Sequence, residues 1–258
     1  MQLSKDTMNQ TIKIYGERNT MTNYVSQIIA LNLTVQELPG VIPDALKHIQ
    51  KKAPGNQWLR DLYFALSYHR NLGWKHSKVM SVEHLRSFSV VGPRLAFLTI
   101  TKNPYSWLLS MHRRPYNTNF SRPDKFEEFL SMEWKTFPRD RCTKVLENPM
   151  QLWNIKNSAY LAIAGGALNV LNQTAETILA DPSSFIRQLS RQFSIPRKTS
   201  SFVNFERSTK NENRTFADYQ HYYGNEEWRD HLSKEAIGII NQHIDQDLMQ
   251  RFDYQILE

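Results

Sequence analysis

The chain has 258 residues, of which 40% are hydrophobic and 22% are charged, so it can bury a sizeable core and wholesale disorder is excluded. No apolar run reaches the roughly 20 residues of a membrane-spanning helix, the N-terminus lacks a secretory signal, and the single cysteine, Cys142, excludes an internal disulfide, so we expect a cytoplasmic protein. The formal charge of +7 favours an anionic partner, but the basic residues are too dispersed for a nucleic-acid interface.

The first half of the chain contains two strand patterns, each followed by a polar turn and a helical pattern. β-branched and apolar residues predict a strand at 11–15, and a polar loop leads into a helix predicted at about 20–33. Residues 34–57 contain several prolines and glycines and predict a loop-rich insertion with one helical turn. A short helix comes next, followed by a short strand at Leu72–Lys75. The nearly continuous apolar run at 94–101 predicts a strand covered on both faces.

The second half is mainly helical, and Pro104 opens its first predicted helix directly after the strand at 94–101. Further helices are predicted at 124–135, 149–165, 181–195 and 231–252, with a strand at 167–173 and an irregular polar segment at 199–227. Strands that alternate with helices are typical of a mainly parallel sheet with helices on both faces. We therefore expect one α/β domain over residues 1–258.

The loop after the first strand, Gly16–Asn23, has the layout of an anion site. Ligands of parallel sheets bind beyond the carboxyl ends of the strands, where the N–H groups at a helix N-terminus attract anions. Arg18 adds a fixed cation, and short donors follow at Thr20, Thr22 and Asn23. The loop lacks the second glycine and the lysine of a P-loop, which disfavours a magnesium-nucleotide site. The alternative is a polar turn in which Thr20 caps the helix.

A similar arrangement follows the strand at 94–101. Lys102 stands at the end of that strand, and Ser110 lies eight residues later, about two turns into the next helix. A cation and a hydroxyl so placed predict contacts to a second phosphate. Taken alone, a lysine such as Lys102 is more often a solvated loop lysine.

Four segments, taken in chain order, resemble sulfotransferases of a bacterial or viral type. They are YGERNTMTNYV, GWKHS, FLTITKNPYSWLLSMHRRPY and ETILADPSSFIRQLSRQFSI, and they span about residues 11–195. Arg18 stands where the family commonly has lysine, Lys102 stands where arginine is more usual, and Thr20–Met21 replaces a common serine-glycine pair. The resemblance implies a P-loop-NTPase-like sulfotransferase fold.

The resemblance also implies the transfer of a sulfuryl group from 3′-phosphoadenosine 5′-phosphosulfate (PAPS) to a hydroxyl or amine, with a histidine base and no metal. It assigns the 5′-phosphosulfate to Arg18, Asn19, Thr20, Met21, Thr22 and Asn23, and the 3′-phosphate to Lys102 and Ser110, with Arg214 or Arg207 as a late contact. His76 is expected to act as the base, with Arg18 stabilising the leaving group and Lys75 holding the transferred group.

Several alternatives stay open from the sequence. Glu17, His69, His84 and His112 compete with His76 for the role of base. Two alternatives to a sulfotransferase are a nucleotide-kinase-like P-loop enzyme and an inactive anion-binding module with this fold. The acceptor is a small molecule, a glycan or a lipid headgroup, and segments 34–70 and 112–145 are expected to wall its site.

Overall fold

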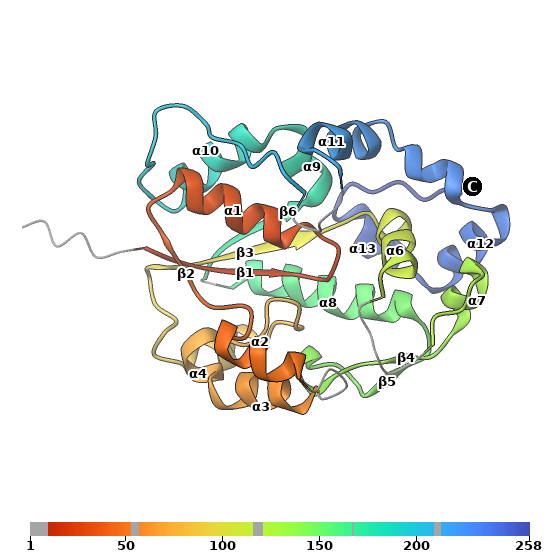
Figure 1. Cartoon of the computed structure of the whole chain (residues 1–258), viewed down its shortest axis with the longest axis horizontal. Helices are drawn as coiled ribbons and strands as arrows, with labels where there is room; N and C mark the ends of the chain where they lie inside the picture. The colour runs from red at the N-terminus through yellow and green to blue at the C-terminus, as the bar shows by residue number, and fades with distance from the viewer. Residues whose placement is uncertain (1–9, 53–56, 116–120, 167, 209–212) are drawn as a thin grey trace, which may run out of the picture.

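The computed structural model describes residues 10–52, 57–115, 121–166, 168–208 and 213–258, and these residues fold around a four-stranded parallel sheet (Figure 1). Its strands are β1 (Thr11–Gly16), β2 (Gln36–Glu37), β3 (Leu95–Thr101) and β6 (Asn169–Thr174), in the order β2-β1-β3-β6. Ile14 of β1 lies opposite Leu98 of β3, which lies opposite Leu171 of β6. The predicted α/β class with a parallel sheet is confirmed.

Helices connect the strands, as parallel pairing requires. They are α1 (Thr22–Asn32), α2 (Asp44–Lys51), α3 (Trp58–Leu66), α4 (Tyr68–Asn71), α5 (Val82–Arg86), α6 (Pro104–Arg113), α7 (Phe126–Ser131), α8 (Pro149–Ala164), α9 (Ala175–Ala180), α10 (Pro182–Gln192), α11 (Phe216–Gly224), α12 (Lys234–His243) and α13 (Gln246–Gln250), with 3₁₀ turns η1 (Pro138–Asp140) and η2 (Glu227–His231). A small antiparallel pair joins β4 (Trp134–Lys135) to β5 (Val145–Leu146). None of the described helices is long and apolar enough to cross a bilayer.

The period-two pattern of β1 divides its side chains between two helical layers. Ile14 packs with Val25 of α1 in a core that α9 and α10 complete. Tyr15 points to the other face and packs with Tyr160 of α8. Figure 1 shows α1, α9 and α10 on one side of the sheet and α8 with α2, α3 and α4 on the other. Helices α6, α7, α8, α12 and α13 form a further core beyond the end of the sheet.

The N-terminal signals of the later helices work as expected. Proline occupies the first turn of α6, α8 and α10, where its missing N–H has no helical partner to lose. The residue before each proline caps the helix: Asn103, Asn148 and Asp181 accept from backbone N–H groups of the first turn. These caps confirm the predicted helix starts.

The short strand predicted at Leu72–Lys75 is wrong. Leu72 has a φ of 57° and ends α4, and the chain continues as a loop that lies across the end of β1. The insertion at 34–57 also holds more structure than one helical turn, because α2 alone has eight residues.

Three predicted boundaries in the second half are wrong as well. The helix predicted at 124–135 ends at Ser131, because Met132 is extended and Trp134–Lys135 pairs as β4. The segment 199–227 was expected to be irregular but contains α11, whose start is held by the capping pair Thr215 and Asp218. The closing helix is broken at Ile244, which adopts an extended conformation between α12 and α13.

Candidate functional site

The loop between β1 and α1 curls tightly against the end of the sheet. Asn19 and Met21 have φ values of 65° and 55°, in the left-handed region. Thr20 Oγ1 donates to the carbonyl of Glu17 at 2.6 Å, so Thr20 braces the loop and the alternative that it caps α1 is wrong. At Gly16 a Cβ atom would lie 2.7 Å from Thr20 Oγ1 and 2.9 Å from a carbonyl oxygen of β3, so the close approach needs glycine.

The curled loop leaves the N-terminus of α1 open. Met21 occupies the cap position in a left-handed conformation, and no side chain among the described residues caps the helix. The first turn of α1 contains no acidic residue. The backbone N–H groups of residues 22–24 have no intrahelical partner, and the helix dipole adds partial positive charge. This end of α1 is therefore suited to an anion.

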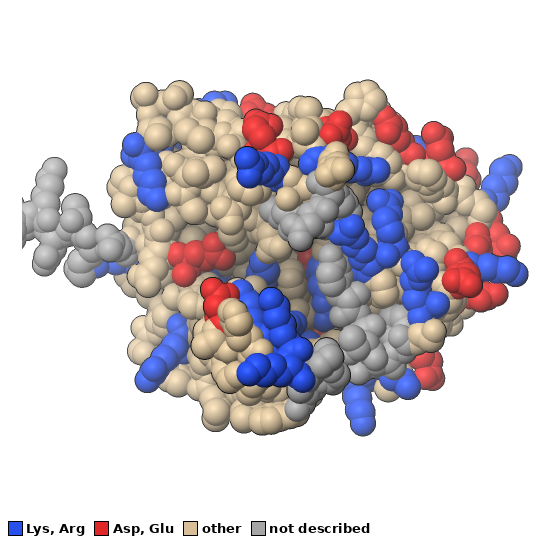
Figure 2. Space-filling view, viewed as in Figure 1, with Lys and Arg blue, Asp and Glu red and all other residues tan. Residues whose placement is uncertain are grey.

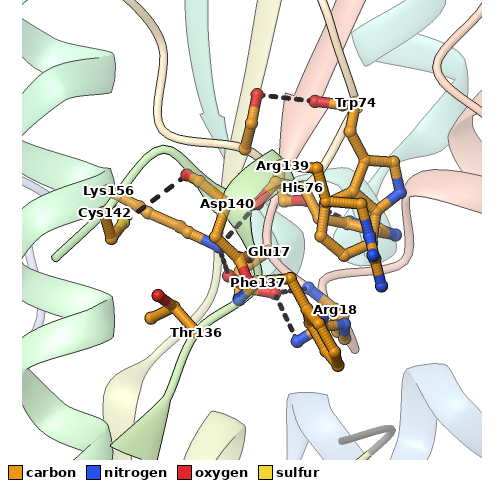
Figure 3. A network of polar contacts seen from close by, with 12 residues as sticks. Glu17, Arg18, Trp74, His76, Thr136, Phe137, Arg139, Asp140, Cys142 and Lys156 are labelled. Atoms are coloured by element: carbon orange, nitrogen blue, oxygen red, sulfur yellow. Dashed lines mark hydrogen bonds and ion pairs between the residues drawn. The ribbon is translucent and has the colours of Figure 1, made fainter. Parts of the chain in front are cut away.

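A network of buried charged residues holds the β1–α1 loop through Glu17 (Figure 3). Lys156 of α8 is fully buried and donates to the carboxylates of Glu17 and Asp140, the latter at 2.8 Å, and to the carbonyl of His76 at 2.6 Å. Burial acts to lower the pKa of Lys156, but Asp140 and Glu17 outweigh it and raise that pKa above its usual value. Glu17 also accepts from the N–H of Arg18 at 2.6 Å. Glu17 is thus a bonded member of the network rather than an open base.

His76 lies beside the loop with one ring nitrogen committed. Nδ1 contacts the carbonyl oxygen of Gly16 at 2.5 Å, which selects the tautomer that carries its proton on Nδ1. Burial, followed by the charge of Lys75, lowers the pKa of His76 well below its usual range. The ring is therefore neutral at pH 7, and Nε2 is left as a proton acceptor. His76 lines the larger of the two cavities described below.

Lys75 reaches the first turn of α1. Its Nζ donates to Asn23 Oδ1 at 2.5 Å, and its carbonyl accepts from the N–H of Gly16 at 2.9 Å. Burial lowers the pKa of Lys75, partly offset by the charge of Glu37. These contacts place an ammonium group next to the open end of α1.

The other candidate bases lie elsewhere. His69 and His84 are exposed, and His84 packs against Phe88. His112 Nε2 contacts the carbonyl of Pro123 at 2.9 Å. None of these three histidines lines either of the cavities next to the loop.

The end of β3 brings Lys102 and Ser110 together, as their spacing suggested. Lys102 Nζ donates to Ser110 Oγ at 2.9 Å and to the hydroxyl of Tyr223 at 2.8 Å, and it lies 4.1 Å from the centre of the Tyr223 ring. Trp153 donates to the carbonyl of Lys102 at 2.9 Å, and Glu176 accepts from the next N–H at 3.0 Å. The solvated-lysine alternative is therefore wrong, because Lys102 is only 3% exposed.

Asn19 connects the two anion-ready loops. Its side-chain amide donates to the carbonyl oxygens of Ser110 and Arg114, both at 3.3 Å. Trp107 of α6 donates to the carbonyl of Arg18 at 2.9 Å. The β1–α1 loop and α6 are consequently held as one surface.

Two cavities meet at this surface. The aromatic pocket is lined by Asn19, Met21, Tyr24, Lys102, Ala175, Glu176, Leu179, Phe205, Arg207, Ser208, Phe216, Tyr219 and Tyr223. The basic pocket has a volume of about 440 Å³ and is lined by Arg18, Asn19, Met21, Thr22, Asn23, Val41, Gln57, Arg60, Trp74, Lys75, His76, Arg114 and Arg139. Asn19 and Met21 line both, so the pockets adjoin at the loop. Figure 2 shows Lys and Arg side chains gathered around the central hollow.

Arg214, the predicted late contact to the 3′-phosphate, lies outside both pockets. Arg214 is exposed and lies 5.9 Å from the ring of Tyr222, and it lines neither pocket. Arg207, the second choice from the sequence, lines the aromatic pocket. Arg207 and Thr215 form an isolated antiparallel bridge, which brings Arg214 close along the chain without placing it in the cavity.

Several functional residues had no signal in the sequence. Lys156 holds Glu17 across a separation of 139 residues and also bonds to Asp140, and a lone lysine within a helical pattern gives no hint of burial. Arg60 and Arg139 come from segments that were assigned only as acceptor walls. Among the described residues no group of three or more His, Cys, Asp or Glu side chains is placed to hold a metal ion.

Comparison with known proteins gives a similarity in structure but none in sequence. No protein-family model matches the chain, and no curated protein matches it significantly. Among solved structures the chain is similar to the sulfotransferase domain from the curacin biosynthetic pathway, with a TM-score of 0.49 and 8% sequence identity, over 96% of this chain and 99% of that one. The function is therefore inferred from the residues of the site itself.

Proposed function

We propose that this protein transfers a sulfuryl group from PAPS to a hydroxyl or amine of an acceptor. One observation carries the proposal: an aromatic pocket with a buried lysine and a basic pocket with a neutral histidine adjoin at an uncapped helix N-terminus. A nucleotide donor and a separate acceptor need such adjoining sites, with the transferred group at the junction.

The aromatic pocket suits the adenosine part of the donor. Tyr24 and Phe216 stack at 5.3 Å between ring centres and supply apolar surface for a purine. Lys102 lines the same pocket and is bonded to Ser110, so the pair offers a cation and a neighbouring hydroxyl to the 3′-phosphate. Arg207 is the late arginine better placed for that phosphate, because it lines the pocket.

The open end of α1 suits the 5′-phosphosulfate. Its N–H groups supply donors that are already oriented. Lys75, bonded to Asn23 in the first turn of α1, replaces Arg18 in this proposal as the cation that stabilises the charge developing on the bridging oxygen, because Arg18 lies over Trp74. In the proposed step, Nε2 of His76 takes the proton of the acceptor hydroxyl while the acceptor oxygen forms a bond to sulfur. The bond from sulfur to the phosphate oxygen breaks, and the nucleotide leaves with that electron pair.

The state of His76 supports its role as base. A neutral imidazole can accept a proton at pH 7 without first losing one, and the Gly16 carbonyl holds the ring in the useful tautomer. Such a base contributes about 10²–10⁴ in rate. The carbonyl also stabilises the imidazolium that forms, because Nδ1–H donates to it more strongly when the ring is charged.

Thermal unfolding with the product nucleotide, 3′-phosphoadenosine 5′-phosphate (PAP), tests the donor site. A ligand at about 100 times its Kd stabilises the folded state by roughly 2.7 kcal/mol. We expect PAP to raise the melting temperature and ATP with magnesium to leave it unchanged. Lys102→Met should weaken the PAP response, whereas Lys198→Met, which changes an exposed lysine on the far side of α1, should not. A response to ATP with magnesium alone would instead support a nucleotide kinase, and no response to either would support a non-catalytic module.

A further inference from the structure

Three arginines line the basic pocket, and we call them the arginine cluster: Arg18, Arg60 and Arg139. Arg18 and Arg139 lie 4.7 and 4.8 Å from the centre of the Trp74 ring (Figure 3). Both also lie over Phe137, at 5.9 and 4.2 Å. The aromatic rings thus hold two cations close together, although the two like charges repel each other.

The arginine cluster keeps donors unused where they are buried. Arg18 and Arg139 are 6% and 5% exposed, yet Arg18 Nη1 and Arg139 Nε have no hydrogen-bond partner among the described residues. A buried, unpaired donor on a charged group carries a large desolvation penalty. Both side chains also line the basic pocket, so the charge of their guanidinium groups acts on a ligand there.

The local carboxylates only partly balance these charges. Asp61 pairs with Arg139 at 2.8 Å, and Glu17 lies 4.0 Å from Arg18 but is already bonded to Lys156. No carboxylate side chain is among the described residues that line the basic pocket. Burial and then the charge of Arg18 lower the pKa of Arg60, which shows that the two guanidinium groups repel each other.

Two of the three arginines are fixed in place before any ligand binds. Arg139 donates to Asp61 and, at 2.7 Å, to Gln57 Oε1. Arg60 donates through Nε to Gln50 Oε1. Guanidinium groups that are already held in place bind carboxylate, sulfate and phosphate groups with little loss of side-chain entropy.

We propose, on the basis of the proposed function, that the acceptor carries an oxoanion of its own, and that the arginine cluster binds it beside His76. The donor is expected at α1 and in the aromatic pocket, whereas Arg60 and Arg139 come from α3 and η1 on the opposite wall. Their charge is therefore available to the acceptor. The substrate class is a hydroxyl compound with a carboxylate, sulfate or phosphate group, such as an acidic sugar.

Titration calorimetry with inorganic sulfate, at constant ionic strength and with saturating PAP, tests the arginine cluster directly. We expect wild-type protein to bind one sulfate, and Arg60→Gln and Arg139→Gln to weaken this binding by about tenfold or more, since each removes a charge-assisted contact. Arg191→Gln, which removes an exposed charge on α10, should leave it unchanged. Arg60→Gln keeps the test valid if loss of the Asp61 ion pair unfolds the Arg139 variant.

Competition with three sugars then identifies the chemistry. Glucuronate and glucose 6-phosphate, one a carboxylate and the other a phosphate ester, should displace sulfate, and neutral glucose should not. The proposal would be overturned by any of three results: no sulfate binding, sulfate binding that is unchanged in both arginine variants, or glucose that competes as well as the two charged sugars. If PAP itself does not bind, the proposed function fails, whereas the sulfate titration of nucleotide-free variants still decides the role of the arginine cluster.

Discussion

Replacing Lys156 with methionine tests how the site is held in position. Lys156 is fully buried, and its ammonium group bonds to two buried carboxylates and to the carbonyl of His76. Methionine keeps most of the side-chain volume but leaves Glu17 and Asp140 without their shared cation. Breaking a buried ion pair by removing one partner costs about 3–5 kcal/mol. For a domain of this size that loss corresponds to a fall of roughly 6–20 °C in melting temperature.

The pH dependence of the loss separates this mechanism from poor packing. In the wild type, burial acts to raise the pKa of Asp140, but Lys156 and then Arg18 hold it below the usual value. Without Lys156, burial dominates, and the folded state binds a proton more tightly than the unfolded chain. The stability of the variant therefore falls as the pH rises through that raised pKa. We expect the difference from wild type to be larger at about pH 8 than at about pH 5.

Chemical denaturation at both pH values measures the effect. Lys198→Met serves as the control, because Lys198 is exposed and bonds only to a carbonyl at the end of α1. The triple variant Glu17→Gln, Asp140→Asn, Lys156→Met removes all three charges and should recover much of the lost stability. A loss below about 1 kcal/mol for Lys156→Met, or a loss independent of pH, would refute the reasoning from buried charge.

Four further predictions follow from single residues. His76→Ala should lower kcat by about 10²–10⁴ while PAP still binds, with His69→Ala near wild type in the same transfer assay; equal rates would exclude His76 as the base. Since the pKa of His76 is depressed, wild-type activity should stay level from pH 8 to pH 6.5 and fall only at lower pH. Lys13 is buried and its pKa is lowered to about 7. Between pH 7 and pH 9 the unfolded chain therefore keeps a proton on Lys13 that the folded chain has lost, and the free energy of unfolding should rise by about 1.4 kcal/mol per pH unit. Denaturation curves of Lys13→Met should lack this slope. Gly16→Ala should destabilise the fold by about 1–3 kcal/mol and weaken PAP binding in calorimetry, because its Cβ would lie 2.7 Å from Thr20 Oγ1; an unchanged variant would mean that the loop is free to shift.

The sequence by itself determined three strands of the parallel sheet, β1, β3 and β6, and the position of the anion-ready loops. The apolar runs at β1 and β3 are long enough to identify buried parallel strands, and the polar residues that follow each of them had to lie at one edge of the sheet. Pro104, the first residue of α6, gave a local start signal that depends on no distant residue. The pairing of Lys102 with Ser110 was also local, since a helix places residues separated by about two turns on one side.

Only the tertiary structure decided how the loops are held and what surrounds them. Glu17 was a candidate base in the sequence and became a bonded carboxylate, because α8 brings Lys156 to it from 139 residues away. The strand expected at Leu72–Lys75 became a loop, because Lys75 and His76 bond to the end of β1 rather than to a neighbouring strand. Arg60 and Arg139 reach the basic pocket from separate segments with no common spacing. Contacts between distant segments leave no periodic trace in a sequence, and so the chemistry of the basic pocket emerges only when the chain folds.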